Sequence, residues 1–152
     1  MEFPDRDVVA SFLDAQSLPS FVRVDHDPSS TTLTEPTTHV RDALARLDLD
    51  SLAPGARVAV GVGSRGIHRI DEYAATVVAA LTERGFDPVV VPAMGSHGGA
   101  TAEGQRETLA SLGVTETRVG APIDARMDVE RVDEVRVGET SYPVFVASAV
   151  LE

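Results

Sequence analysis

The residue best suited to acid–base chemistry is His97, which lies in a glycine-rich segment, residues 95–100 (GSHGGA). Imidazole changes its charge near neutral pH, so histidine is the most common general base. Ser96 precedes His97, and the backbone N–H groups of Gly98 and Gly99 are open to an anion. This pattern predicts proton transfer beside a bound anion. The alternative is that His97 only closes the turn through a backbone hydrogen bond.

A second candidate binding segment, residues 61–66, reads GVGSRG and matches the G-x-G-x-x-G pattern of dinucleotide-binding loops. The match is partial, because Asp87 lies at the start of the next predicted strand and not at its end, where an acid would bind the ribose. The charge of Arg65 suits a carboxylate or a phosphate, and Ser64 and Gly66 flank it. Nucleotide binding and a simple solvent-facing turn both remain alternatives for this loop.

The remaining candidate residues give weaker evidence for a functional site. His68 follows Arg65 by three positions and is a candidate for the same pocket, with exposure to solvent as the alternative. Thr101 is the predicted N-cap of a helix that has Glu103 in its first turn. No pair of histidines has a typical metal-ligand spacing, and the G-x-S-x-G motif of serine hydrolases is absent.

Alternating helical and strand patterns must position these loops. We expect a short strand at 21–24, a helix beginning at Pro36, strands at 57–62 and 86–92, helices at 71–84 and 101–112, and a C-terminal β-hairpin at 129–146. The predicted fold is one α/β domain, residues 1–152, with a Rossmann-like βαβ core in a three-layer, mostly parallel sheet covered by helices on both faces. Ligands of such sheets bind beyond the carboxyl ends of the strands, where both loops lie.

Composition excludes several classes of function. There are 24 acidic and 13 basic residues, which gives a net charge of −11, so nucleic-acid binding through counterion release is not expected. The acidic composition suggests a halophilic protein. Neither a membrane span nor a signal peptide is visible, so a cytoplasmic protein is expected. All basic residues are arginines and cysteine is absent, which excludes Schiff-base lysines and thiolate ligands from this chain.

Residues 63–67 (GSRGI) and 92–105 (PAMGSHGGATAEGQ) together resemble the amino-terminal domain of the lactate racemase (LarA-like) family, whose members use a nickel-pincer nucleotide. The resemblance is strongest over 58–114. It implies that His97 is the catalytic acid/base and that Arg65 binds substrate or cofactor. The other candidate binding residues are Ser64, Gly66, Ser96, Gly98, Gly99 and Thr101. Well-characterised members have Asp-x-Thr-Arg-Pro and His-Arg-Pro at these loops; the differences here point to another 2-hydroxy acid or a divergent branch.

The resemblance implies an isomerase that racemises or epimerises a 2-hydroxy acid by hydride transfer. The family's cofactor-carrying lysine, nickel-binding histidine and second catalytic histidine come from sequence further on. We therefore expect an amino-terminal part of a longer enzyme that needs its carboxy-terminal domain as partner and is inactive alone. Leu151 and Glu152 are either native or cloning residues. The alternatives are a nucleotide- or anion-binding α/β module without catalysis, and a scaffold whose acidic face docks a partner.

Overall fold

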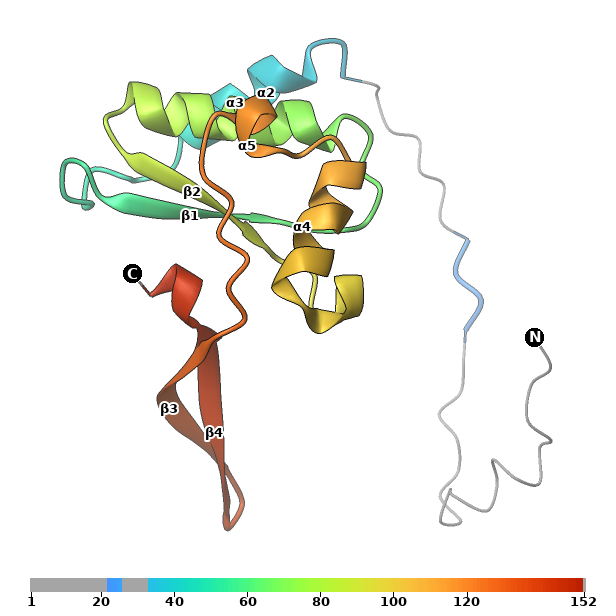
Figure 1. Ribbon diagram of the computed structural model, residues 1–152, viewed down its shortest axis with the longest axis vertical. Coiled ribbons are helices and arrows are strands. Elements are labelled where there is room, and N and C mark those ends of the chain that lie inside the picture. The colour runs from blue at the N-terminus through green and yellow to red at the C-terminus, as the bar shows by residue number, and fades with distance from the viewer. Residues whose placement is uncertain (1–21, 26–32, 152) are drawn as a thin grey trace. The chain divides into compact units, whose positions relative to one another are not determined.

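The computed structural model describes residues 22–25 and 33–151 (Figure 1). The chain forms two units, residues 1–32 and 33–152. Residues 22–25 have no regular secondary structure, so the strand predicted there is wrong for the positions that the structure describes. The remaining elements all belong to the second unit.

The centre of this unit is an alternation of strand, helix and strand. Strands β1 (Arg57–Val62) and β2 (Asp87–Pro92) pair in parallel, with Val60 opposite Val90, and helix α3 (Ile70–Glu83) connects them. Both strands are rich in β-branched residues, which suit a half-buried pleated surface. The predicted βαβ unit is therefore confirmed, with boundaries that differ by one residue at most.

The hydrophobic core lies between this sheet and its helices. Helix α2 (Pro36–Ala45) packs on α3, while α4 (Ala102–Ser111) and the short α5 (Glu116–Val119) complete the cover. Figure 1 shows α2, α3 and α5 on the same side of β1 and β2. The buried cluster comprises Val62, Ile70, Ala74, Val78, Val90, Met94, Leu109, Val114, Val119, Ala121 and Ile123.

The opposite face of β1 is open. Side chains alternate along a strand, so Ala59 and Gly61 point away from the side on which Val60 and Val62 face the core, and both are exposed. Each sheet in the described ranges contains two strands. The structure thus confirms a mixed α/β fold with a parallel pair, whereas the predicted three layers with helices on both faces go beyond what it shows.

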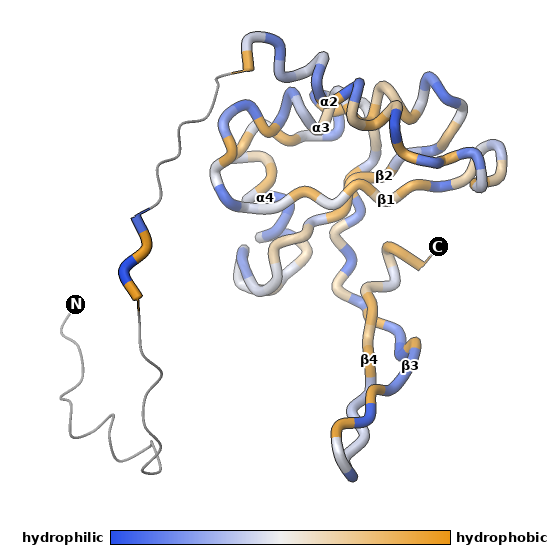
Figure 2. Tube along the Cα trace, turned by 180° about the vertical axis from the view of Figure 1, so that it is seen from behind, coloured by the Kyte–Doolittle hydropathy of each residue, from blue (hydrophilic) through white to orange (hydrophobic). Residues whose placement is uncertain are grey.

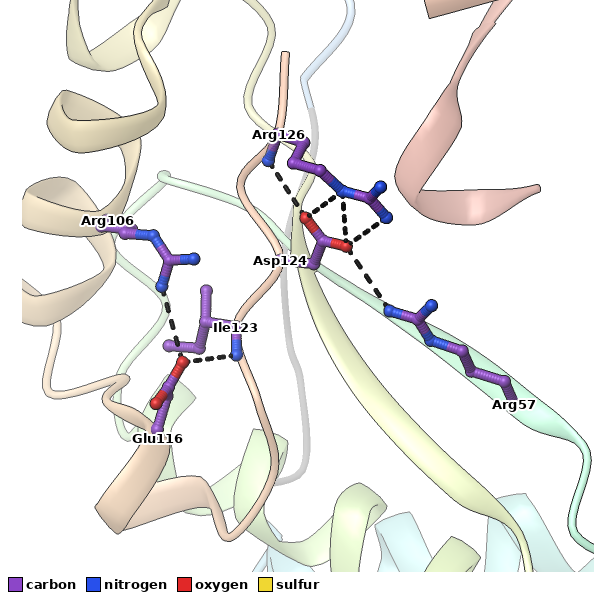
Figure 3. A network of polar contacts seen from close by, with 6 residues as sticks. All are labelled: Arg57, Arg106, Glu116, Ile123, Asp124 and Arg126. Atoms are coloured by element: carbon purple, nitrogen blue, oxygen red, sulfur yellow. Dashed lines mark hydrogen bonds and ion pairs between the residues drawn. The ribbon is translucent and has the colours of Figure 1, made fainter. Parts of the chain in front are cut away.

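A segment that the sequence analysis missed lies beside β2. The backbone N–H of Val90 donates to Pro122 O at 2.9 Å, that of Asp124 donates to Val90 O at 2.8 Å, and Ile123 forms a parallel bridge with Val90. Side chains anchor it (Figure 3): Glu116 accepts from Ile123 N at 3.0 Å, and Asp124 pairs with Arg126 at 2.8 Å. These tertiary contacts align the segment with the parallel pair.

The predicted hairpin is confirmed. Strands β3 (Val129–Val137) and β4 (Thr140–Ala147) pair antiparallel, and Gly138 takes a φ of 62° in the turn. Hydrophobic residues concentrate along β1 and β2, whereas the hairpin mixes hydrophobic and hydrophilic positions (Figure 2). Within the described ranges, none of the helices has both the length and the apolar character needed to cross a bilayer.

Candidate functional site

The two glycine-rich loops meet where β1 and β2 end. Ser64, in the loop after β1, places its Oγ 2.5 Å from Nδ1 of His97, the first residue of the 3-10 helix η1 (His97–Ala100) that follows β2. The strands are adjacent and parallel, so their carboxyl ends share one edge of the sheet. Two of the predicted site residues are therefore in direct contact across 33 positions of sequence.

A cavity of about 320 Å³ opens at this contact. Its polar side chains are those of Ser64, Arg65 and His97. The complete lining is Gly63, Ser64, Arg65, Ile67, Ala93, Met94 and His97. No carboxylate of the described residues belongs to this lining, although the chain as a whole carries a net charge of −11. A cavity with this composition favours an anionic ligand.

Arg65 is placed differently from most arginines of this protein. Its side chain has neither an ion pair nor a hydrogen bond with any residue that the structure describes. By contrast, Arg41 binds Glu83 at 2.7 Å and Arg118 binds Asp71 at 2.9 Å. The guanidinium at the cavity is thus available to a carboxylate or phosphate of a ligand.

An apolar cavity of about 290 Å³ adjoins the first, and it was not predicted from the sequence. The two share Gly63 and Ile67 in their linings. Side chains from α2, β1 and α3, among them Val40, Val60 and Tyr73, form its walls. The alternation of Val58, Val60 and Val62 along β1 was the one available signal, because it places these side chains on the face toward the helices.

Packing accounts for Gly98. This residue has a φ of +66°, and a Cβ atom there would collide with the backbone of Gly104 and lie 2.6 Å from Gln105 N. A glycine is required by both its conformation and its surroundings. Gly99 also has a positive φ, of 67°, but a Cβ there would meet open space. The glycine pair thus fits the turn against α4, in addition to any contact with an anion.

The hydroxyl of Thr101 caps α4, as predicted. Its Oγ1 accepts from Gly104 N at 3.1 Å and donates to Gly98 O at 3.1 Å. Gln105, which is only 5% exposed, donates from Nε2 to Gly95 O at 2.8 Å. The sequence analysis missed Gln105; its only signal is a position one turn before Leu109 on the buried side of the helix.

The loop after β1 departs from dinucleotide-binding geometry. The third glycine of that motif normally permits close packing of helix and strand, but a Cβ at Gly66 would have no neighbour within 4 Å. Helix α3 begins only at Ile70, and Asp71 and Glu72 occupy its first turn. Hydrogen bonds from Arg118 and Arg69 lower the pKa of Asp71 and of Glu72, respectively.

The other predicted residues do not line the cavity. Ser96 and His68 are exposed to solvent, as is Gly66. Across the described ranges they are absent from the cavity lining, as are Gly98, Gly99 and Thr101. The structure therefore brings together Ser64, Arg65 and His97, and places the remaining candidates around the turn that carries His97.

The family's cofactor does not fit the residues of this chain alone. Among the residues that the structure describes, no three histidine or carboxylate side chains group in a way that would hold a metal ion. The full sequence contains neither lysine nor cysteine for covalent attachment. What the described residues do offer is a cavity lined by one guanidinium and one imidazole.

Comparison of the chain with protein-family models, with curated proteins and with solved structures finds no match.

Proposed function

We propose that this chain is the amino-terminal domain of a nickel-pincer-dependent 2-hydroxy acid racemase or epimerase, in which His97 is the acid/base and Arg65 binds the substrate carboxylate. One observation carries the proposal: the Ser64–His97 contact of 2.5 Å joins the two loops at a cavity that contains Arg65 and no carboxylate. The resemblance of residues 63–67 and 92–105 to the lactate racemase family supplies the type of reaction.

The residues of this chain account for binding and proton transfer. A guanidinium offers a carboxylate two parallel hydrogen bonds, which fix the orientation of the substrate. His97 then removes the proton of the substrate hydroxyl as the carbon beside it is oxidised. The family's second catalytic histidine, from sequence further on, would exchange the hydroxyl proton of the opposite enantiomer, because each orientation of the hydroxyl needs its own base. In the proposed reaction the hydrogen on that carbon leaves as hydride, because an imidazole that acts without a metal ion to stabilise the enediolate cannot remove it as a proton.

This chain does not supply the hydride acceptor. We therefore assign no step to its described residues beyond carboxylate binding and proton transfer, and we expect the chain alone to be inactive. The nickel-pincer nucleotide would be held mainly by the carboxy-terminal domain. The active cleft would then lie between two domains, a common place for sites that bind small molecules.

The decisive experiment replaces His97 in the enzyme that contains this chain, after its nickel content has been measured. We expect His97→Gln to abolish racemisation of 2-hydroxy acids while the fold persists, because His97 is exposed and lies outside the core. The matched control is His39→Gln, since His39 is exposed on α2 and away from the cavity. Unchanged turnover in the His97 variant would refute the assignment.

The second candidate function is an anion-binding module without chemistry. The Arg65 guanidinium, which has no partner among the described residues, supports this module as well as it supports the racemase, because anion binding needs no acid/base. Calorimetry separates the two possibilities. A preference for 2-hydroxy carboxylates over phosphate and NAD supports the racemase; a preference for phosphate or NAD, with normal turnover after His97→Gln, supports the module.

A further inference from the structure

We infer that Ser64 is a positioning residue that holds His97 in the tautomer with a proton on Nδ1, so that Nε2 is the atom that exchanges a proton with the ligand. This inference rests on the proposed function, to which it adds the identity of the reacting nitrogen and a role for Ser64. Its basis is the hydrogen bond between Ser64 Oγ and His97 Nδ1.

The contact fixes one edge of the imidazole ring. A neutral imidazole carries a single N–H, and the hydrogen bond made by one nitrogen determines which of the two is protonated. Ser64 Oγ is the only described partner of the His97 side chain. Two arrangements satisfy the 2.5 Å contact: Nδ1–H donates to Oγ, or Oγ–H donates to Nδ1.

The second arrangement would make Ser64 a nucleophile activated by His97. That chemistry normally requires a third group, usually a carboxylate, which orients the base through its other nitrogen. No carboxylate lines the cavity, and in the described part of the chain none contacts this ring. The structure therefore lacks the group on which an activated serine would depend.

The first arrangement, in which Nδ1–H donates to Ser64 Oγ, persists in both protonation states of His97. When His97 takes a proton on Nε2, both ring nitrogens become donors. Nδ1–H then continues to donate to Ser64 Oγ, so the contact survives the change of charge. In the reverse arrangement the ring would be protonated at Nδ1, and the contact would survive only if the Ser64 hydroxyl rotated from donor to acceptor. Ser64 thus does for His97 what a buried carboxylate does for other catalytic histidines, but without adding a negative charge to a site for anions.

Nitrogen NMR of the ¹⁵N-labelled 152-residue chain tests the inference. The spectra are recorded at alkaline pH, and His97→Gln identifies the signals of His97 among those of the four histidines. We expect Nδ1 of His97 to be the protonated nitrogen. Ser64→Ala should move the majority population to Nε2–H, Ser64→Thr should retain Nδ1–H because it keeps the hydroxyl, and Ser96→Ala should change nothing.

A predominant Nε2–H form in the unmodified chain would overturn the inference. So would an Nδ1–H form that persists after Ser64→Ala in a chain whose amide spectrum shows it folded. In the enzyme that contains this chain, Ser64→Ala should lower kcat with little change in KM, since carboxylate binding by Arg65 is intact. Neither NMR result depends on turnover, so failure of this inference is distinguishable from failure of the proposed function, which the His97→Gln variant tests.

Discussion

Gly98 and Gly104 touch through their backbones: the carbonyl group of Gly98 occupies the space where a Cβ atom at Gly104 would stand. Alanine at position 104 should raise the intrinsic helix stability of α4 by about 1 kcal/mol. We nevertheless expect Gly104→Ala to destabilise the protein, because overpacking of a close contact costs about 1–3 kcal/mol. For a chain of this length, each kcal/mol shifts Tm by about 2–4 °C.

Thermal denaturation measures this effect, and Gly66→Ala is the matched control. A Cβ at Gly66 meets open space, and the residue does not have a positive φ. A Gly104→Ala variant as stable as the Gly66→Ala variant would show that the turn moves away from α4 at no cost. In that case the packing explanation for Gly98 would be wrong.

The hydroxyl of Thr101 is predicted to stabilise α4 and the His97 turn together. Loss of an N-cap side chain costs about 1 kcal/mol, within a range of roughly 0.5–2. Thr101→Ala should therefore lower stability and speed amide exchange in η1, because the bond to Gly98 O is lost as well. Thr101→Ser keeps both hydrogen bonds and should restore stability. If Thr101→Ala instead left stability unchanged and weakened ligand binding alone, Thr101 would act on the ligand.

Arg65 should determine affinity for anions. Hydrogen bonds to charged groups contribute about 1.5–3 kcal/mol, so Arg65→Ala should weaken binding of a 2-hydroxy carboxylate roughly tenfold to a hundredfold. Calorimetry at low and high salt should show an affinity that falls with ionic strength in the unmodified chain and falls less in the variant. The control is Arg136→Ala on the hairpin, another exposed arginine without a partner among the described residues. Equal affinities in all three proteins would exclude Arg65 from the binding site.

Asp124 should make stability depend on pH. A hydrogen bond from the Arg126 side chain lowers the pKa of Asp124, with smaller contributions from the Arg126 backbone N–H and the charge of Arg57. A carboxyl group whose pKa is lower in the folded state stabilises the fold above its unfolded-state value, about 3.9. That contribution is lost as the pH falls through the folded-state value.

Asp124→Asn should therefore destabilise the chain at neutral pH, and the difference should shrink in acid. Urea denaturation from about pH 7 down to about pH 2 measures the difference. Asp50→Asn is the control, because the Asp50 carboxylate is exposed in a turn and has no partner in the described part of the chain. A difference that stayed constant across this range would mean that Asp124 acts through packing and not through its charge.

Local sequence signals predicted the elements of the βαβ unit well. Strand 57–62 is recognisable because β-branched residues form a short apolar run, and the start of α4 because Thr101 is an N-cap residue followed by Glu103. Gly138 marked the hairpin turn. In each case the information lies within a few residues of the element that it specifies.

Features that depend on distant contacts were not predictable in this way. Residues 122–124 contain no strand pattern, and their conformation depends on Val90, Glu116 and Arg57. Because the carboxyl ends of parallel strands share one edge of the sheet, the sequence predicted that Ser64 lies near His97. It could not indicate that their side chains form a hydrogen bond. The pair Gly98–Gly99 was compatible with anion binding and with a tight turn. Only the position of α4 shows that packing requires a glycine at position 98.

The attachment of the His97 turn to α4 has a mechanical consequence. Gln105 anchors Gly95, Thr101 binds Gly98, and the backbones of Gly98 and Gly104 are in contact. We therefore expect the turn to move together with the ten residues of α4 and not independently of them. The buried side chain of Leu109 in turn holds α4 in the core. Hydrogen exchange in η1 should accordingly follow the slow exchange of α4, and substrates should meet a histidine that is already in place.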